Sequence, residues 1–193
     1  MSTTNILFSG VGGQGIILAS RLVAKCAFNA GIMVKESELH GMAQRGGSVV
    51  SHVRYGDEVN SPLIPAGHAD VLVAMEELEG LRYTHFLKEG GKVILNLRKI
   101  PPPNINPSTP YPDDAPARLA SMGFGVVTLD AMAIAKDCGT PKAENIVLVG
   151  ALSNYLAFDT PLWEETIKES VPAKFLDANL TAFHKGRETT AFK

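Results

Sequence analysis

Four glycines and a glutamine lie together near the start of the chain, between an apolar run and a helical pattern. Ile6–Phe8 predicts a buried strand, and the loop Gly10–Gly15 (GVGGQG) follows it directly. Over Ile16–Asn29 the apolar residues recur at helical spacing, and Gly31 suits the C-terminal end of that helix. A strand, a glycine loop and a helix in this order indicate an α/β fold whose first helix packs closely on the sheet.

Apolar runs and helical patterns continue to alternate along the rest of the chain. The alternation predicts a single domain over residues 1–193, of α/β class, with a Rossmann-like, doubly wound and mostly parallel sheet and helices on both faces. Residues 5–36 are expected to form its first βαβ unit, and residues 49–54 a half-buried strand. Further strands are predicted at 71–75, 93–95 and 126–128, and helices at 76–88, 118–122, 130–138, 143–158, 162–170 and 172–185.

The segment Pro101–Pro116 interrupts this alternation, because it holds seven of the chain's 12 prolines. Proline fixes φ and has no backbone N–H to donate, so the segment is expected to be an extended surface loop. The helix and strand predicted after it resume the earlier pattern. We therefore expect a long loop inside one domain, not a linker between two.

Composition excludes several classes of protein. The 193 residues carry 18 Lys and Arg against 20 Asp and Glu, so the basic surface of a nucleic-acid-binding protein is not expected. The two cysteines are far apart and form no CxxC motif, and the five histidines have no metal-ligand spacing, so no iron–sulfur cluster or metal site is predicted in this chain. No apolar run reaches the ~18 residues of a membrane span. These features favour a cytoplasmic protein with no nucleic-acid or membrane partner.

The glycine loop has two possible roles. Gly10, Gly12 and Gly15 satisfy the GxGxxG pattern, in which the helix N-terminus and the glycine backbone bind an anion such as a pyrophosphate. Glu36, about 20 residues further on, could then bind a ribose hydroxyl. Alternatively, the glycines only let the helix approach the sheet. Neither role accounts for Gly13 and Gln14.

A second glycine-rich segment, Glu38–Ser48, follows the second predicted strand. Arg45 is a cation beside Gly46 and Gly47, whose backbone can approach a phosphate or a partner; a solvated loop is the alternative. Because ligands of open α/β sheets bind at the carboxyl ends of the strands, we expect both glycine loops to form one site. No self-sufficient catalytic set of residues is apparent in the sequence, so no catalytic residue is predicted.

With both loops identified, the chain resembles the gamma-type catalytic domain of the 2-oxoacid:ferredoxin oxidoreductases over essentially its whole length. Gly10–Gly15 is similar to that family's GxGGQG signature, and Arg45–Gly47 to its RGG signature. The longer stretch Ser37–Val50 (SELHGMAQRGGSVV) is most similar to the beta subunits of the indolepyruvate branch, and Asn145 and Gly150 to the family's C-terminal helices.

The resemblance implies one subunit of a larger enzyme. In that family a large alpha subunit holds thiamine diphosphate and [4Fe–4S] clusters, coenzyme A is the co-substrate and ferredoxin accepts the electrons. The implied reaction is the oxidative decarboxylation of indolepyruvate and other aryl pyruvates to aryl acetyl-CoA, with no cofactor bound by this chain alone. The implied binding residues are Gly10, Gly12, Gly13, Gln14 and Gly15 of the first loop and Arg45, Gly46 and Gly47 of the second.

Three alternatives stay open at the level of sequence. The chain could be a free-standing NAD-binding Rossmann oxidoreductase that uses Gly10–Gly15 and Glu36. It could be a scaffold subunit whose loops only pack against a partner. It could also be a pyruvate-specific gamma subunit of the same family.

Overall fold

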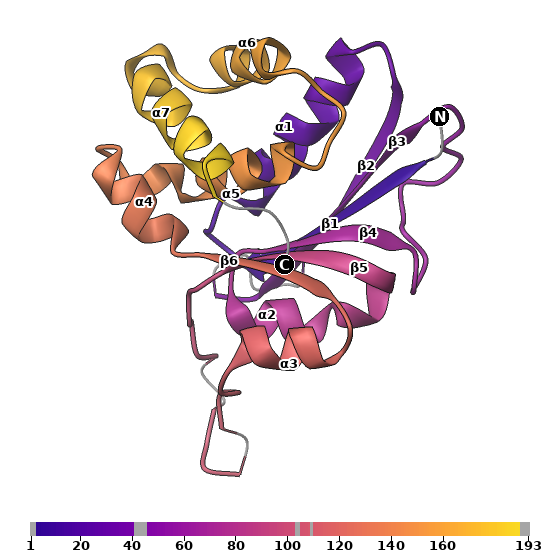
Figure 1. Cartoon of the computed structure of the whole chain (residues 1–193), viewed down its shortest axis with the longest axis vertical. Coiled ribbons are helices and arrows are strands. Elements are labelled where there is room, and N and C mark those ends of the chain that lie inside the picture. Colours follow the sequence, from indigo (N-terminus) through magenta and orange to yellow (C-terminus); the bar gives the residue numbers. More distant parts are fainter. Residues whose placement is uncertain (1–2, 41–45, 103–104, 109, 190–193) are drawn as a thin grey trace.

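The computed structural model describes residues 3–40, 46–102, 105–108 and 110–189. A six-stranded sheet runs through the centre, with α2 and α3 on one face and α1, α5, α6 and α7 on the other (Figure 1). Its strands are β1 (Thr4–Val11), β2 (Met33–His40), β3 (Ser48–Gly56), β4 (Ala69–Ala74), β5 (Leu87–Asn96) and β6 (Gly125–Leu129). The helices are α1 (Ile16–Asn29), α2 (Glu77–Arg82), α3 (Ala115–Ser121), α4 (Ala131–Asp137), α5 (Glu144–Ser153), α6 (Thr160–Ser170) and α7 (Leu176–Arg187), with 3-10 turns η1 (Thr84–Phe86), η2 (Pro141–Ala143) and η3 (Ala173–Phe175).

The strands lie in the order β2-β3-β1-β4-β5-β6. β1, β4, β5 and β6 are parallel to one another, whereas β3 is antiparallel to both β1 and β2. The predicted α/β class and the mostly parallel sheet with helices on both faces are therefore confirmed. The expected βαβ unit is formed by β1, α1 and β2, but β3 lies between its two strands because the chain returns from β2 as a hairpin.

The position of β3 also corrects its predicted exposure. Ser51 and His52, expected on opposite faces of a half-buried strand, are 0% and 1% exposed. An inner strand is covered by neighbours on both edges and by other parts of the chain on both faces, so polar residues in it are buried too.

Each inner strand contributes apolar side chains to both faces of the sheet. In β1, Ile6 and Phe8 belong to the core cluster beneath α1 and α5, whereas Leu7 belongs to the cluster on the α2 and α3 face. Successive side chains of a strand point to opposite faces, so a sheet with two covered faces needs these continuous apolar runs. The apolar runs that predicted the strands thus follow from this layered arrangement.

The predicted helices are present, but two of them end earlier than expected. The helix predicted over 143–158 is wrong after residue 153, where α5 ends. The helix expected over 76–88 is wrong in its second half, because α2 ends at Arg82 and β5 begins at Leu87. Leu87 is buried and pairs with Ala69 of β4, so tertiary contacts draw this segment into the sheet. α3 begins at Ala115, earlier than expected, because Asp114 caps its first turn. Within the described ranges, no helix has both the length and the apolar character needed to cross a membrane.

Candidate functional site

The first glycine loop connects the carboxyl end of β1 to α1. Gly15 is the N-terminal cap residue of α1 and has a φ of 75°, a conformation that side-chain-bearing residues rarely adopt. Asn145 at the start of α5 donates a hydrogen bond from Nδ2 to the Gly15 carbonyl (3.1 Å). The first turn of α1, whose N–H groups have no partner within the helix, is thereby fixed at the carboxyl edge of the sheet.

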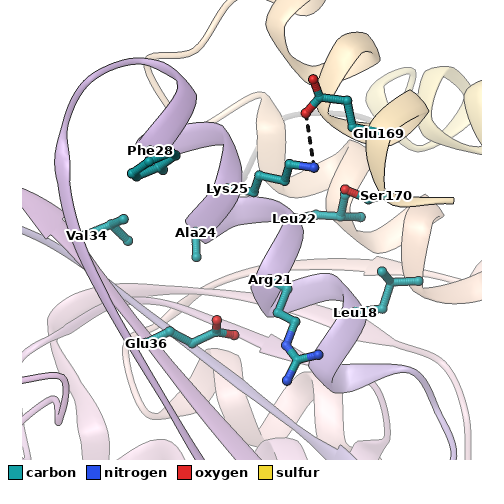
Figure 2. Close-up of a pocket in the computed structure, with 10 residues that line it drawn as sticks. All are labelled: Leu18, Arg21, Leu22, Ala24, Lys25, Phe28, Val34, Glu36, Glu169 and Ser170. Atoms are coloured by element: carbon teal, nitrogen blue, oxygen red, sulfur yellow. Dashed lines mark ion pairs between the residues drawn. The ribbon is translucent and has the colours of Figure 1, made fainter.

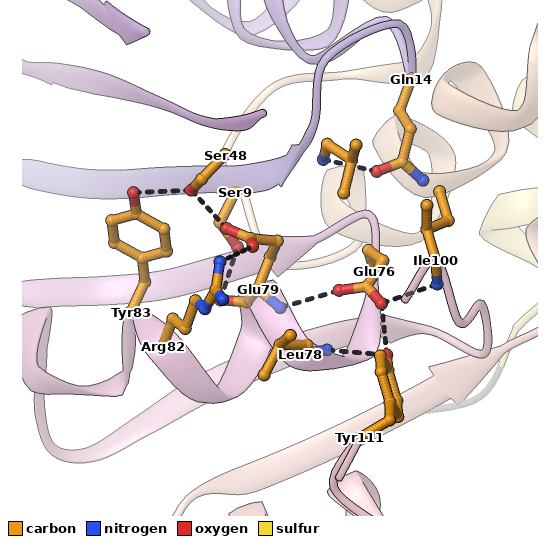
Figure 3. Close-up of polar contacts among 11 residues, drawn as sticks. Ser9, Gln14, Ser48, Glu76, Leu78, Glu79, Arg82, Tyr83, Ile100 and Tyr111 are labelled. Atoms are coloured by element: carbon orange, nitrogen blue, oxygen red, sulfur yellow. Dashed lines mark hydrogen bonds and ion pairs between the residues drawn. The ribbon is translucent and has the colours of Figure 1, made fainter. Parts of the chain in front are cut away.

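Gln14 holds this loop closed from within. The Val11 N–H donates to Gln14 Oε1 (2.7 Å; Figure 3), and Gln14 Nε2 donates to the carbonyl of Met75, directly after β4 (2.8 Å). The side chain thus bridges β1 and β4, where the strand order changes direction and where dinucleotides lie in Rossmann folds. This bridge supplies the explanation that the GxGxxG pattern lacks for Gln14.

The two glycine loops are joined by their backbones. The Gly12 N–H donates to the Gly47 carbonyl (2.8 Å), and the Gly46 N–H donates weakly to the Gly12 carbonyl (3.5 Å). Their predicted juxtaposition is therefore present in the structure. Arg45, and with it residues 41–44, lies outside the described residues.

Gly13 and Gly46 face open space. Their φ angles are 106° and 76°, and among the described residues, chain neighbours aside, no atom lies within 4 Å of a Cβ atom added to either. Glycine is thus required at both positions because of the backbone conformation, and not because a side chain would lack space. The result is two adjacent stretches of accessible backbone beside a helix N-terminus, an arrangement suited to an anionic group.

Glu36 does not belong to this site. β2 is separated from β1 by β3, about 10 Å across the sheet, and Glu36 is level with Ile6, four residues before Gly10. Its carboxylate instead accepts a hydrogen bond from Ser20 of α1 (2.5 Å) and lines a groove of about 700 Å³ between α1, β2 and α6 (Figure 2). Burial raises the pKa of Glu36, and the Ser20 hydrogen bond opposes this. Glu36 is therefore not positioned for the ribose contact expected of an NAD-binding fold.

An acidic turn lies beneath the two loops, between β4 and α2 (Figure 3). Glu76 is completely buried and caps α2 by accepting from the Glu79 N–H (2.9 Å). Glu76 Oε1 also accepts from the Ile100 N–H (3.0 Å) and from the Tyr111 hydroxyl, so it anchors the proline-rich segment at two points. The sequence predicted a helix from residue 76, but it did not predict the contacts of Glu76 with a segment more than 20 residues away.

A second buried carboxylate lies at the same edge, at the start of α5. Glu144 accepts from Asn96 Nδ2 (2.8 Å) and pairs with the half-exposed Arg98 (2.5 Å). Asn96 also donates to the Met75 carbonyl (3.0 Å). No local motif in the sequence indicates this group, because its members come from three separate segments.

Comparison with known protein families supports the family that these two loops suggest. The family model described as "Pyruvate ferredoxin/flavodoxin oxidoreductase" matches residues 5–189. The chain belongs to this family. The family predicted from the GxGGQG and RGG segments is therefore confirmed.

Similar members of the pyruvate ferredoxin/flavodoxin oxidoreductase family are subunits of multi-subunit enzymes. The chain is 42% identical to indolepyruvate oxidoreductase subunit IorB of Thermococcus kodakarensis, over 96% of this chain and 95% of that protein. It is 45% identical to the IorB subunit of Archaeoglobus fulgidus, over 94% and 92% of the two chains. The gamma subunit of a keto/oxoacid ferredoxin oxidoreductase from Geobacter sulfurreducens has a similar structure, with a TM-score of 0.73 and 26% identity over 96% of both chains.

Proposed function

We propose that this chain is the IorB-type subunit of an indolepyruvate:ferredoxin oxidoreductase, which converts indolepyruvate and other aryl pyruvates to aryl acetyl-CoA. The substrate assignment is supported by 42% and 45% identity to two IorB subunits over nearly the full length of each chain. A partner alpha subunit would carry the thiamine diphosphate and the [4Fe–4S] clusters, which supply decarboxylation and electron transfer to ferredoxin. The chain would act as a single gamma-type domain in the cytoplasm.

The proposed role of this chain in substrate binding is inferred from the hydrogen bond between the two glycine loops. The Gly12–Gly47 hydrogen bond places the open backbone at Gly13 beside that at Gly46. Phosphate and carboxylate groups are bound by such backbone N–H groups together with an arginine. In this proposal Gly10–Gly15 and Arg45–Gly47 form one wall of a cleft shared with the alpha subunit and bind an anionic part of coenzyme A or of the oxoacid.

Other side chains of this proposed wall act indirectly. Gln14 fixes the first loop to β4 through the Met75 carbonyl, and Asn145 fixes the start of α1. A preformed loop loses little conformational entropy when it binds a ligand, so these contacts favour tight binding. In this proposal the chain binds and orients the substrates and carries no catalytic residue of its own.

Anaerobic purification of the tagged chain from its native host tests the assignment. We expect a brown complex that contains a large partner, thiamine and iron, and that oxidises indolepyruvate only when coenzyme A is present. Oxidation of phenylpyruvate at a similar rate, with slow oxidation of pyruvate and 2-oxoglutarate, would establish the aryl pyruvate class. Preference for pyruvate would instead favour the pyruvate-specific alternative, and a colourless chain without a partner would contradict the proposal.

Substitution of Arg45 tests the site in the assembled complex. We expect Arg45→Ala to raise the KM for coenzyme A or indolepyruvate about tenfold, because a hydrogen bond to a charged group is lost. Arg118→Ala, which removes the same charge from the exposed face of α3, is the control and should leave both KM values unchanged. If Arg45→Ala changed only assembly of the complex and not turnover per complex, the scaffold alternative would be supported.

A further inference from the structure

A buried carboxylate lies directly beneath the junction of the two glycine loops. Glu79 of α2 is 3% exposed, and its Oε1 pairs with Arg82 Nη1 of the same helix (2.7 Å). Its other oxygen, Oε2, accepts a hydrogen bond from the hydroxyl of Ser48 (Figure 3). Both carboxylate oxygens are thus engaged, one within the helix and one with the strand that follows the second loop.

Ser48 is the point at which the second loop enters the sheet. It is the first residue of β3 and directly follows Gly46 and Gly47 in the chain. Its hydroxyl contacts both Glu79 and the Tyr83 hydroxyl (3.0 Å). One residue before it, the Gly47 carbonyl accepts the hydrogen bond from the first loop. The position of Ser48 therefore determines where the Gly47 carbonyl lies relative to Gly12.

The carboxylate at position 79 is not needed to form α2. The helix is capped by Glu76 and packs on the sheet through Gly80, where a Cβ atom would lie 3.0 Å from Ala74 and Leu95 atoms. Burial raises the pKa of Glu79, which reflects the unfavourable removal of its charge from water. An apolar side chain in such a position is often at least as stable, so stability alone does not explain a charged group here.

We propose that Glu79 is a positioning residue for the candidate site: through Ser48, it holds Gly46 and Gly47 against the first glycine loop. The Ser9 hydroxyl, which comes from β1 and donates to the Glu79 carbonyl (3.3 Å), ties the same helical turn to the strand that precedes the first loop. α2 thus contacts the strand leading into one loop and the strand leading out of the other. That this geometry serves ligand binding rests on the proposed function, whereas the positioning of the loop does not.

Ser48→Ala in the assembled complex is the principal test, with hydrogen–deuterium exchange as the readout of loop position. Removing the hydroxyl should increase exchange about tenfold in the peptides that cover 9–15 and 46–52, because the Gly12–Gly47 hydrogen bond opens more often. The same variant should raise the KM for coenzyme A or indolepyruvate about fivefold with little change in kcat. Ser48→Thr restores a hydroxyl and should restore both values.

Glu79→Gln and Glu77→Gln form a matched pair on the same helix. Both glutamates are buried, but Glu77 pairs with Lys99 (3.8 Å), away from the two loops. We expect Glu79→Gln to show the effects of Ser48→Ala in weaker form, because the amide loses the charge that strengthens the Ser48 hydrogen bond. Glu77→Gln should leave exchange in both loops unchanged. A melting temperature measured for each complex separates a local change from general destabilisation.

The outcomes separate the two proposals. Unchanged exchange in both loops after Ser48→Ala and Glu79→Gln would overturn the positioning role, whatever the kinetics show. Faster exchange in Ser48→Ala would support the positioning role. If KM were unchanged both in that variant and in Arg45→Ala, ligand binding by the loops would be contradicted. Faster exchange with a raised KM would support both.

Discussion

Gly150 and Gly186 face each other where α5 packs against α7, whereas Gly13 and Gly46 face open space beside the candidate site. A Cβ atom at Gly150 would lie 2.1 Å from the Phe183 carbonyl oxygen, and one at Gly186 would lie 2.0 Å from that of Val147. Neither of these two helical glycines has a φ in the left-handed region. The first pair is therefore glycine because there is no space, and the second because of backbone conformation.

The difference separates glycines that stabilise the fold from glycines that shape a surface. Two helices whose backbones touch gain close packing over their whole contact, so a side chain placed there affects the entire α5–α7 layer. A glycine beside solvent has no such neighbours, and its left-handed backbone instead turns N–H groups toward solvent. Gly15 combines both conditions, since its φ is 75° and a Cβ atom would lie 2.6 Å from Asn145 Nδ2. Substitutions in the three classes should therefore differ in both stability and activity.

Gly186→Ala should have the largest effect on stability. In an exposed helix this change is favourable by about 1 kcal/mol, but here the new methyl group would force α5 and α7 apart. We expect a net loss of about 3 kcal/mol in the free energy of unfolding, measured by denaturant unfolding of the full chain. Thr181→Ala, on the exposed side of α7, is the control and should change stability by less than about 0.5 kcal/mol. A Gly186→Ala chain as stable as the wild type would show that the helices separate without cost.

Gly15→Ala should be intermediate, because conformational strain and a clash act together. The left-handed conformation costs a residue with a Cβ atom about 1–2 kcal/mol, and displacement of the Asn145 side chain adds the loss of its hydrogen bond to the Gly15 carbonyl. We expect a loss of about 2 kcal/mol by the same measurement. In the Asn145→Ala background the added cost of Gly15→Ala should be smaller, because the clash is gone. Equal costs in both backgrounds would mean that strain alone is responsible.

The parts of the molecule that depend on local sequence were predictable. The strand at Ile6–Phe8, the loop at Gly10–Gly15 and the helix from Ile16 are adjacent in the chain, and each has a signal of its own. The family could be predicted from the same loop together with Arg45–Gly47, because short glycine-rich segments are constrained at each position. The close approach of the two loops followed from the rule that strand ends meet at one edge of a sheet.

Contacts between distant segments were not predictable from these signals. No local pattern shows that β3 inserts between β1 and β2, and this insertion removes Glu36 from the glycine loop. The Ser48–Glu79 hydrogen bond joins residues 31 positions apart. The glycines of α5 and α7 have ordinary helical surroundings in the sequence, and only the packing of the two helices shows why a side chain is excluded.

Gly13→Ala should have the smallest effect on stability and should distinguish the site from the rest of the fold. With φ at 106° and open space around it, the substitution introduces backbone strain without a clash, so we expect a loss of about 1 kcal/mol. Gly31, just after α1, is the matched control, because its φ is 74° and its surroundings are equally open. Both alanine variants should therefore unfold at slightly lower denaturant concentration, by a similar amount.

Only the Gly13 variant should also change catalysis in the assembled complex. An added methyl group at Gly13 would occupy the space where we propose an anionic ligand contacts the loop, whereas one at Gly31 would lie at the other end of α1. We expect Gly13→Ala to raise the KM for coenzyme A or indolepyruvate several-fold and Gly31→Ala to leave both unchanged. Equal KM values in the two variants would place ligand contact elsewhere on the chain, because a methyl group at Gly13 would then have no effect that the substrates detect.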